Sequence, residues 1–393
     1  MPIFGAPGDD TLLGTPGDDE IYGFDGNDGI RGFEGNDLID GGNGHDFMRG
    51  NEGNDIILGG ADDDYLDGGE GDDQLDGGSG WDRVTYAPSA TGGVTVDLNI
   101  QGVAQTTGQG SDTLIGIEHV SGTAFDDTLT GTSGDNWIWG GSNGSGVTGN
   151  DILSGGGGND LVQVGAGNHV LDGGTGADTL SLHGNGTDIT AAGVTVSLLL
   201  QGAAQATEQG SMTLTGFENL SGSNHDDVLT GDNGDNLLAG YSGNDTLSGG
   251  KGDDVLLGDG VVVVDTHGTG GSGPIVTIDD VSLQANPEPA GNDILDGGKG
   301  DDILNGGGGD DILTGGQNRD EFVFGPSSGD DTITDFSNQD TIVFDGVAGV
   351  DDFSDLTFTA AGGDVLITWG TTDSILLEST PLHTIGAGDF LFI

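Results

Sequence analysis

A nine-residue period runs without a break from residue 5 to residue 85, and it constrains the fold more than any other feature. Each repeat begins with glycine, carries aspartate five residues later and places an apolar residue two positions after the aspartate. The glycines are Gly5, Gly14, Gly23, Gly32, Gly41, Gly50, Gly59, Gly68 and Gly77. The apolar residues are Leu12, Ile21, Ile30, Ile39, Met48, Ile57, Leu66, Leu75 and Val84. This G-G-x-G-x-D-x-U-x pattern is typical of a calcium-loaded parallel β-roll.

The spacing predicts a six-residue turn followed by a three-residue strand. The middle side chain of that strand points inward, because side chains alternate faces along a strand. Glycine supplies the positive-φ conformations that such a turn needs. Two turns reverse the chain twice, so one coil takes eighteen residues, and aspartates eighteen residues apart should stack along one edge. The turns then offer carboxylate and carbonyl oxygens, the ligands that calcium prefers.

The aspartate of each repeat is the predicted calcium ligand. In the first array these residues are Asp10, Asp19, Asp28, Asp37, Asp46, Asp55, Asp64, Asp73 and Asp82. Later repeats add Asp127, Asp160, Asp178, Asp227, Asp245, Asp254, Asp293, Asp302, Asp311 and Asp320. Asn136, His169 and Asn236 replace aspartate, and their lower charge predicts weaker or empty sites. A disordered glycine- and aspartate-rich tract would not keep an apolar residue in phase through the first array.

The negative charge of the chain makes folding depend on counter-ions. The chain has 67 acidic and 6 basic residues, for a net charge of −61. Without counter-ions such a chain should repel itself and stay expanded, so we expect folding to be coupled to metal binding. The charge argues against nucleic acid and anionic membranes as direct partners. No stretch approaches the eighteen or so apolar residues of a transmembrane segment.

The sequence predicts an all-β parallel β-roll or β-helix solenoid with essentially no helix. Interruptions of the nine-residue period divide this solenoid into segments. Positions 93–131 recur at 193–231, which marks a duplicated longer-coil β element. The predicted segments are a first nonapeptide array at 1–85, longer-coil elements at 86–121 and 182–221, further arrays at 122–181, 222–259 and 288–320, a loop or hairpin insertion at 260–287, and a C-terminal β cap at 321–393.

Cysteine is absent, and the N-terminal MPIFGAPGDDTLLG has neither the basic start nor the apolar run of a signal peptide. Taken alone, these features favour a cytoplasmic protein. Cytosolic free calcium is too scarce to fill weak sites, however, so the calcium requirement favours an extracellular location. We therefore expect a secreted protein that is exported without an N-terminal signal peptide.

The arrays, the duplicated V-T-V-x-L…D-D-x-L-T-G element and the C-terminal motifs DTITDF, DVLITW, SILLE and DFLFI resemble those of the RTX family, the haemolysin-type calcium-binding proteins. The resemblance covers essentially the whole chain. It implies export by type I secretion machinery, an uncleaved signal within residues 321–393, and folding on extracellular calcium. Asp389–Phe392 matches the aspartate-plus-aromatics ending of that signal.

Motifs of an effector domain are missing from the sequence, and we predict no enzyme. There is no H-E-x-x-H zinc motif, and the G-x-S-x-G at residues 140–144 lies among glycine-rich repeats. We favour a structural, surface or interaction protein over two alternatives. One is a membrane-acting secreted effector. The other is a carbohydrate-active or polysaccharide-binding module for cell-surface or matrix polysaccharide, in which Trp81, Trp137 and Trp139 would stack on sugars instead of packing at coil irregularities.

Overall fold

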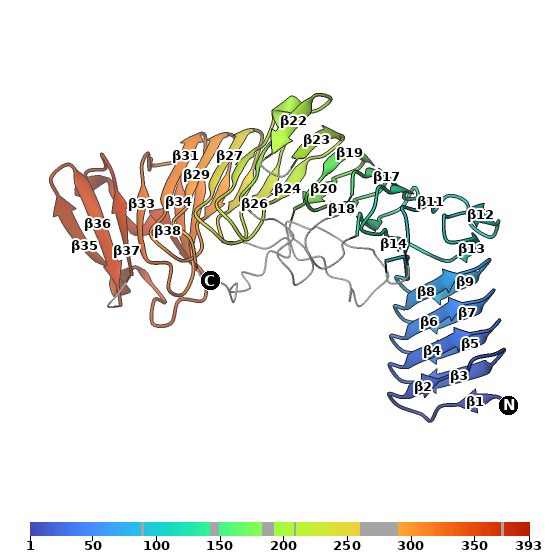
Figure 1. Cartoon of the computed structure of the whole chain (residues 1–393). Coiled ribbons are helices and arrows are strands. Elements are labelled where there is room, and N and C mark those ends of the chain that lie inside the picture. The colour runs from blue at the N-terminus through green and yellow to red at the C-terminus, as the bar shows by residue number, and fades with distance from the viewer. Residues whose placement is uncertain (88–89, 142–148, 183–191, 208–209, 260–289, 371–372) are drawn as a thin grey trace. The chain divides into compact units, whose positions relative to one another are not determined.

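The computed structural model describes residues 1–87, 90–141, 149–182, 192–207, 210–259, 290–370 and 373–393 (Figure 1). One compact unit comprises Met1–Leu180 together with Gly210–Gly216, and a second contains the remaining described residues from Ser181 onward. Regular structure is almost entirely β, with short 3₁₀ helices and no α-helix among the residues described. The predicted insertion at 260–287 and Ser142 of the G-x-S-x-G motif lie outside the described residues.

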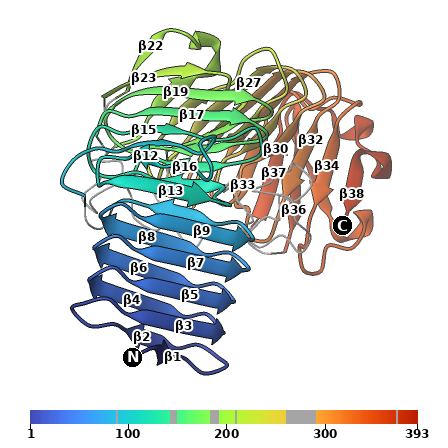
Figure 2. The same cartoon turned by 90° about the vertical axis from the view of Figure 1, so that its right-hand side faces the viewer.

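Two sheets of short parallel strands form the first array, stacked like rungs in Figure 2. One sheet contains β2 (Thr11–Leu13), β4 (Gly29–Glu34), β6 (Phe47–Glu52), β8 (Tyr65–Glu70) and β10 (Arg83–Thr85). The other contains β1 (Ile3–Phe4), β3 (Glu20–Asp25), β5 (Leu38–Asn43), β7 (Ile56–Ala61) and β9 (Gln74–Ser79). Ile21 pairs with Ile39, and Ile39 with Ile57, so each coil takes the eighteen residues that the repeat predicts.

The core of this array is a pair of apolar ladders between the two sheets. Ile21, Ile39, Ile57 and Leu75 project from one sheet, and Ile30, Met48, Leu66 and Val84 from the other. Their exposed fractions do not exceed 2 %. The inward position of the repeat is therefore the one that sequence alternation predicts, and each side chain packs on its counterparts in the neighbouring coils.

The duplicated elements continue the stack. In the first copy, Leu114 pairs with Leu75 of β9, and Val96 pairs with Leu129. The equivalent Val196 of the second copy pairs with Leu229. Strands of the first unit beyond the first array are β11 (Thr95–Asp97), β12 (Gln105–Thr106), β13 (Ser111–Ile115), β14 (His119–Ser121), β15 (Thr128–Thr130), β16 (Trp137–Trp139), β17 (Ile152–Gly157), β18 (Leu161–Gln163), β19 (Asn168–Thr175), β20 (Thr179–Ser181) and β23 (Gly210–Thr215).

The second unit repeats the same coiling and ends in a cap. Its elements are β21 (Thr195–Ser197), η1 (Leu198–Leu200), β22 (Ala204–Thr207), β24 (Asn219–Ser221), β25 (Val228–Thr230), β26 (Leu237–Ala239), β27 (Thr246–Lys251), β28 (Val255–Leu257), β29 (Ile294–Lys299), β30 (Ile303–Asn305), β31 (Ile312–Gln317), β32 (Glu321–Phe324), β33 (Asp330–Ile333), β34 (Thr341–Phe344), η3 (Phe353–Asp355), β35 (Thr357–Ala361), β36 (Asp364–Trp369), β37 (Asp373–Leu377), η4 (Leu382–Thr384), η5 (Ala387–Asp389) and β38 (Phe390–Phe392).

The cap departs from the parallel ladder. β37 still pairs in parallel with β33, but β36 is antiparallel to both β35 and β37. Phe344 and Trp369 meet edge to face with ring centroids 4.9 Å apart, which fills the end of the core with aromatic rings. A solenoid needs such a closing element because its last coil otherwise exposes core and strand edge. The predicted fold class, an all-β solenoid with a C-terminal β cap, is confirmed.

Two neighbouring isoleucines test the core assignment. Ile57 is fully buried, whereas Ile56 on the opposite face of the same strand is 41 % exposed. We expect Ile57→Ala to lower the free energy of unfolding by about 2–5 kcal/mol, because it removes buried methyl groups and leaves a cavity. Ile56→Ala should cost far less. Denaturant unfolding in excess calcium measures both, and equal losses would contradict the inward position of Ile57.

Candidate metal centre

The repeat aspartates are tied from coil to coil by their own backbone amides. The amide of Asp10 donates to Oδ1 of Asp28 at 2.7 Å, and that of Asp28 to Oδ1 of Asp46 at 2.8 Å. The same bond joins Asp46 to Asp64 at 2.9 Å. The partners lie eighteen residues apart, so one such ladder runs along each turn edge of the roll. One carboxylate oxygen of each rung is thereby used in holding two coils together.

The second carboxylate oxygen is buried and, within the described part of the chain, has no hydrogen-bond donor at many rungs. Those rungs are Asp28, Asp37, Asp46, Asp55, Asp64, Asp73, Asp82, Asp160, Asp245, Asp254, Asp293 and Asp302. In all of these turns except that of Asp82, this oxygen lies where a Cβ on the first glycine would be. A Cβ added to Gly23 would collide with Oδ2 of Asp28 and with the carbonyl oxygen of Gly41 in the next coil. The turn thus brings a carboxylate and a carbonyl oxygen together in a space that only glycine leaves open.

This donor set fits a hard cation. A buried carboxylate oxygen without a donor is unfavourable unless a cation or a proton meets it. Calcium is held by carboxylate and backbone carbonyl oxygens, which are the groups that converge here. The part of the chain that the structure describes contains no group of three or more acidic, histidine or cysteine side chains that could hold a metal. The turns instead combine one carboxylate per rung with main-chain oxygens.

Burial raises the pKa of these carboxyl groups, and stacked neighbours raise it further. The pKa of Asp46 is raised to about 6 and that of Asp64 to about 8, in both cases chiefly because burial disfavours the charged form. The pKa of Asp293 is raised to about 9, with repulsion from Asp245 and Asp311 added to burial. Backbone amides lower each value but do not offset the burial. Without a cation, these rungs therefore retain protons at pH values at which an exposed aspartate is ionised.

A second ladder runs beside the first in the opposite sense. It is formed by the residue before each ligand position. The backbone amide of Asn27 donates to Oδ1 of Asp9 at 2.9 Å, and the backbone amide of His45 donates to Oδ1 of Asn27 at 3.0 Å. Trp81 donates in the same way to Asp63 at 2.8 Å. Each turn is thus bonded through adjacent side chains to the coil before it and to the coil after it.

Several predicted ligands differ from the rest because their second oxygen already has a donor. Oδ2 of Asp127 accepts from the amide of Thr123 at 2.6 Å and from its hydroxyl. Oδ2 of Asp227 accepts from the amide of Ser223 at 2.5 Å. In the first coil, Ala6 donates to Asp10 and Thr15 donates to Asp19. Donors from the protein thus meet the oxygens that a cation would otherwise contact.

The remaining predicted ligands are rungs of the same ladders. Asp160 donates its amide to Oδ1 of Asp178 at 2.8 Å. Asp293 and Asp302 donate in the same way to Asp311 at 2.8 Å and to Asp320 at 3.0 Å.

Sequence reasoning missed four aspartate rungs: Asp112, Asp151, Asp331 and Asp340. Asp112 accepts the backbone amide of Asp73 at 3.1 Å, and Asp340 accepts that of Asp320 at 3.1 Å. Asp151 accepts the amide of Asp127 at 3.0 Å, and Asp331 accepts that of Asp311 at 3.0 Å. Oδ2 of Asp331 is buried without a hydrogen-bond donor among the described residues, whereas Oδ2 of Asp151 lies 3.2 Å from Nδ1 of the buried His169. The glycine-to-aspartate interval is stretched between Gly140 and Asp151, and Asp331 lies in the cap, so the nine-residue frame passed over both. The shorter signal aspartate–x–apolar, as in Asp-Ile-Leu and Asp-Thr-Ile, would have found them.

The substituted positions remain rungs. His169 is fully buried, accepts the amide of Asp151 at Nδ1 (3.2 Å) and places Nε2 3.1 Å from the carbonyl oxygen of Gly165. Asn136 and Asn236 donate their side-chain amides to the carbonyl oxygens of Glu118 and Glu218. Glu118 is itself a rung, because its carboxylate accepts the backbone amide of Asp82 at 3.0 Å.

The tryptophans are engaged by other side chains of the protein. Trp81 stacks on His119 with ring centroids 5.4 Å apart, and the guanidinium of Arg83 lies 4.2 Å from the ring centre of Trp137. The indole nitrogen of Trp137 donates to Gln163 at 3.2 Å. These contacts favour packing over sugar stacking as the role of these rings.

Comparison with known proteins decides the family. A model of the RTX calcium-binding nonapeptide repeat matches residues 4–39, 31–66, 49–84, 121–143, 145–180, 220–260 and 290–322, more than half of the chain. The chain belongs to the RTX calcium-binding repeat family. The prediction of calcium-binding repeats is thereby confirmed, and calcium is the metal that these repeats bind.

Curated relatives and solved structures give little further information about this RTX protein. No curated protein matches it significantly. Among solved structures it is similar to the extracellular lipase LipA from Serratia marcescens, at 19 % identity and a TM-score of 0.22. The match covers 68 % of this chain and 40 % of the lipase, so the chain spans less than half of that protein. Among the described residues, no helix has the length and apolar character needed to cross a membrane.

The raised pKa values predict an unusual dependence on pH. The ladder carboxyls have higher pKa values in the folded, metal-free chain than in the unfolded chain, where aspartate titrates near about 3.9. Their contribution to stability is therefore present below about pH 4 and is lost as pH rises through about 6 to 9. We expect calcium-stripped protein to gain β-structure on acidification from pH 8 to pH 5, measured by far-UV circular dichroism. A loss of β-structure over that interval would contradict the burial of these groups in the metal-free fold.

Proposed function

We propose that this chain is a secreted calcium-binding protein that folds when it meets extracellular calcium and then serves as a structural, surface or interaction protein. The observation that carries the proposal is the in-phase stack of buried carboxylate oxygens that accept no hydrogen bond from the described residues. The proposed ligands are the aspartates with such an oxygen, together with Asp151, Asp178, Asp311, Asp320 and Asp331. Asp10, Asp19, Asp127 and Asp227 are weaker candidates because protein donors already meet their second oxygens.

Calcium supplies positive charge between coils that would otherwise repel one another. Within the chain, Oδ1 of each aspartate accepts the backbone amide of the neighbouring coil. Oδ2 and a glycine carbonyl oxygen of the next coil both lie beside the first glycine of the repeat. Glycine at the first repeat position leaves room for both oxygens. Folding and metal binding are then one process, because stacked turns are absent from the unfolded chain.

This coupling suits export of an unfolded chain. A polyanion of net charge −61 stays expanded where calcium is scarce and collapses into coils where it is abundant. We propose that residues 321–393, which form the cap once folded, also carry the signal for type I secretion. The packing of the tryptophans gives no support to the carbohydrate-active alternative at those rings, and we propose no catalytic activity.

A calcium titration tests the proposal. We expect metal-free protein at pH 8 to show a coil spectrum and to convert cooperatively to a β spectrum at about 10⁻⁴–10⁻³ M calcium, the range of extracellular calcium modules. Far-UV circular dichroism measures the transition, and magnesium at the same concentrations is the control because it demands a stricter octahedral geometry. A full β spectrum in metal-free buffer at pH 8 would show that calcium does not drive folding.

Neighbouring rungs should act together. Asp46→Asn and Asp64→Asn each keep an oxygen acceptor but remove a charge, and the chain itself tolerates asparagine in this position at Asn136 and Asn236. We expect each substitution to raise the calcium midpoint, with a coupling free energy between them of about 0.5–3 kcal/mol in a double-mutant cycle. Asp62→Asn with Glu70→Gln, both on exposed residues, is the charge-matched control. Strictly additive free-energy changes of the two substitutions would contradict the sharing of ions between adjacent turns.

A further inference from the structure

Two phenylalanines near the start of the first array hold strained backbone conformations. Phe24 and Phe33 occupy the position after the first glycine of their repeats, and both have φ of 82°. In the following coils this position belongs to Gly42 and Asn51, residues that adopt positive φ more readily. A bulky side chain in this region costs on the order of 1–3 kcal/mol. Because glycine would avoid this cost, we infer that the phenylalanine side chains have a role of their own.

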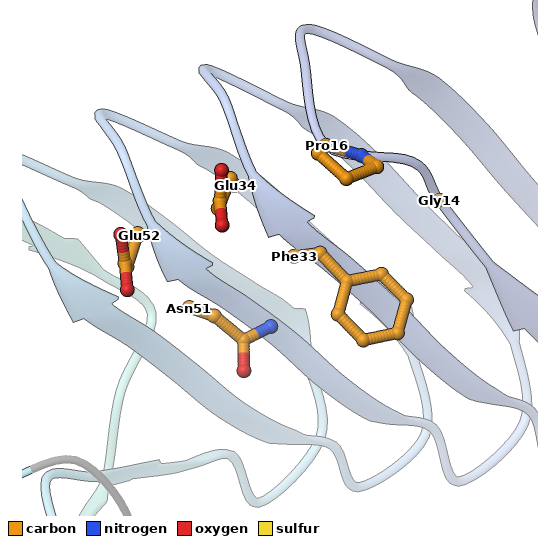
Figure 3. Close-up of a pocket in the computed structure, with 6 residues that line it drawn as sticks. All are labelled: Gly14, Pro16, Phe33, Glu34, Asn51 and Glu52. Atoms are coloured by element: carbon orange, nitrogen blue, oxygen red, sulfur yellow. The ribbon is translucent and has the colours of Figure 1, made fainter.

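Phe33 lines a groove of about 440 Å³ with Gly14, Pro16, Glu34, Asn51 and Glu52 (Figure 3). Phe33 pairs with Asn51, and Glu34 with Glu52, across the parallel strands β4 and β6. In Figure 3 the phenyl ring and the Asn51 amide stand side by side, with the two glutamates along the adjoining row. The ring is half-buried and both glutamates are exposed. The groove therefore combines an apolar platform with acceptors and one carboxamide.

A second groove, of about 450 Å³, lies around Phe24 at the equivalent place of the preceding repeat, although Gly42 and Asn43 stand there in place of Asn51 and Glu52. Pro7, Phe24, Asp25 and Asn43 line it at positions nine residues before Pro16, Phe33, Glu34 and Glu52. Asn43 donates to Asp25 at 2.7 Å, which fixes its polar rim. Phe24, however, also stacks on Phe4 with ring centroids 6.1 Å apart, so its ring has a packing role that Phe33 lacks. The Phe33 groove is the better site to test.

We propose that the Phe33 groove binds a neutral, hydroxyl-rich glycan. The phenyl face suits the apolar face of a sugar ring, and the guanidinium of Arg31, 5.7 Å from the ring centre, lies against the same side chain. Glu34 and Glu52 accept hydrogen bonds from hydroxyl groups, and the Asn51 amide can both donate and accept. The volume lies within the range of about 300–1,000 Å³ found for small-molecule sites. The two glutamates and the overall charge of −61 repel acidic polysaccharides.

The site goes beyond the proposed structural role, and it depends only on the coils being stacked. Phe33 and Asn51 belong to successive coils, so the groove exists only in the folded chain. Glycine is the natural residue at φ of 82°, so Phe33→Gly relieves strain while removing the platform. If Phe33 served packing alone, the same substitution would destabilise the roll.

Affinity electrophoresis of the full calcium-loaded chain tests this site. The gels would contain dextran, laminarin or mannan, with alginate as the acidic comparison. We expect at least one neutral polysaccharide to retard the wild-type chain. Phe33→Gly should weaken that interaction by about tenfold or more, as for loss of a central aromatic anchor. Phe47→Ala, an exposed phenylalanine outside both grooves, should leave it unchanged.

Folding is followed separately by circular dichroism and thermal midpoint in calcium, so failure at this site is distinguishable from failure of calcium-driven folding. Phe33→Gly should keep or raise the midpoint. Glu34→Gln is the second variant, because it preserves shape and should reduce retardation while leaving the spectrum intact. Equal migration of wild type and both variants in every neutral polysaccharide, or stronger retardation by alginate, would overturn the proposal.

Discussion

The hydrogen bond from one aspartate's amide to the carboxylate of its counterpart in the next coil is the interaction on which the structure depends. It stacks the ladder side chains, most of them aspartates, at the spacing of neighbouring strands. At rungs such as Asp46 and Asp64 it also leaves the second oxygen buried without a donor among the described residues. The same geometry that holds the coils together thus creates the charge repulsion that a cation must offset.

This ladder also explains how the solenoid accommodates coils that contain different numbers of residues. Asp73 reaches Asp112 across 39 residues, and Asp245 reaches Asp293 across 48, yet the bond is the one formed at the regular spacing of 18. Each coil contacts only its neighbours, so extra residues between two rungs change nothing further along. The longer-coil elements therefore enter the stack without loss of register. The cap ends it by turning to antiparallel pairing at β36.

Calcium dependence and recognition occupy different parts of the repeat. The first glycine and the aspartate form the proposed cation-binding turn, where a side chain at the glycine would collide with neighbouring oxygens. From Phe24 to Gly78 the second position has positive φ, and there Phe33 departs from glycine and places a half-buried ring in a groove. A coiled scaffold can thus combine the proposed calcium turns with the proposed binding groove, since the two use adjacent but separate residues.

By itself, the sequence determined the coil length, the inward apolar ladder and the stacking of aspartates, because each follows from a strict period of nine. It also predicted the metal, because the repeated turn offers oxygen ligands. Tertiary structure decided which carboxylate oxygens of the described residues have a protein hydrogen-bond donor. Thr123 satisfies Asp127, whereas no described group donates to Oδ2 of Asp160, and Asp151 joins the ladder from outside the frame. The reason is physical: a period fixes the spacing of backbone groups, but the hydrogen-bond partners of a buried oxygen depend on side chains that meet only when the coils stack.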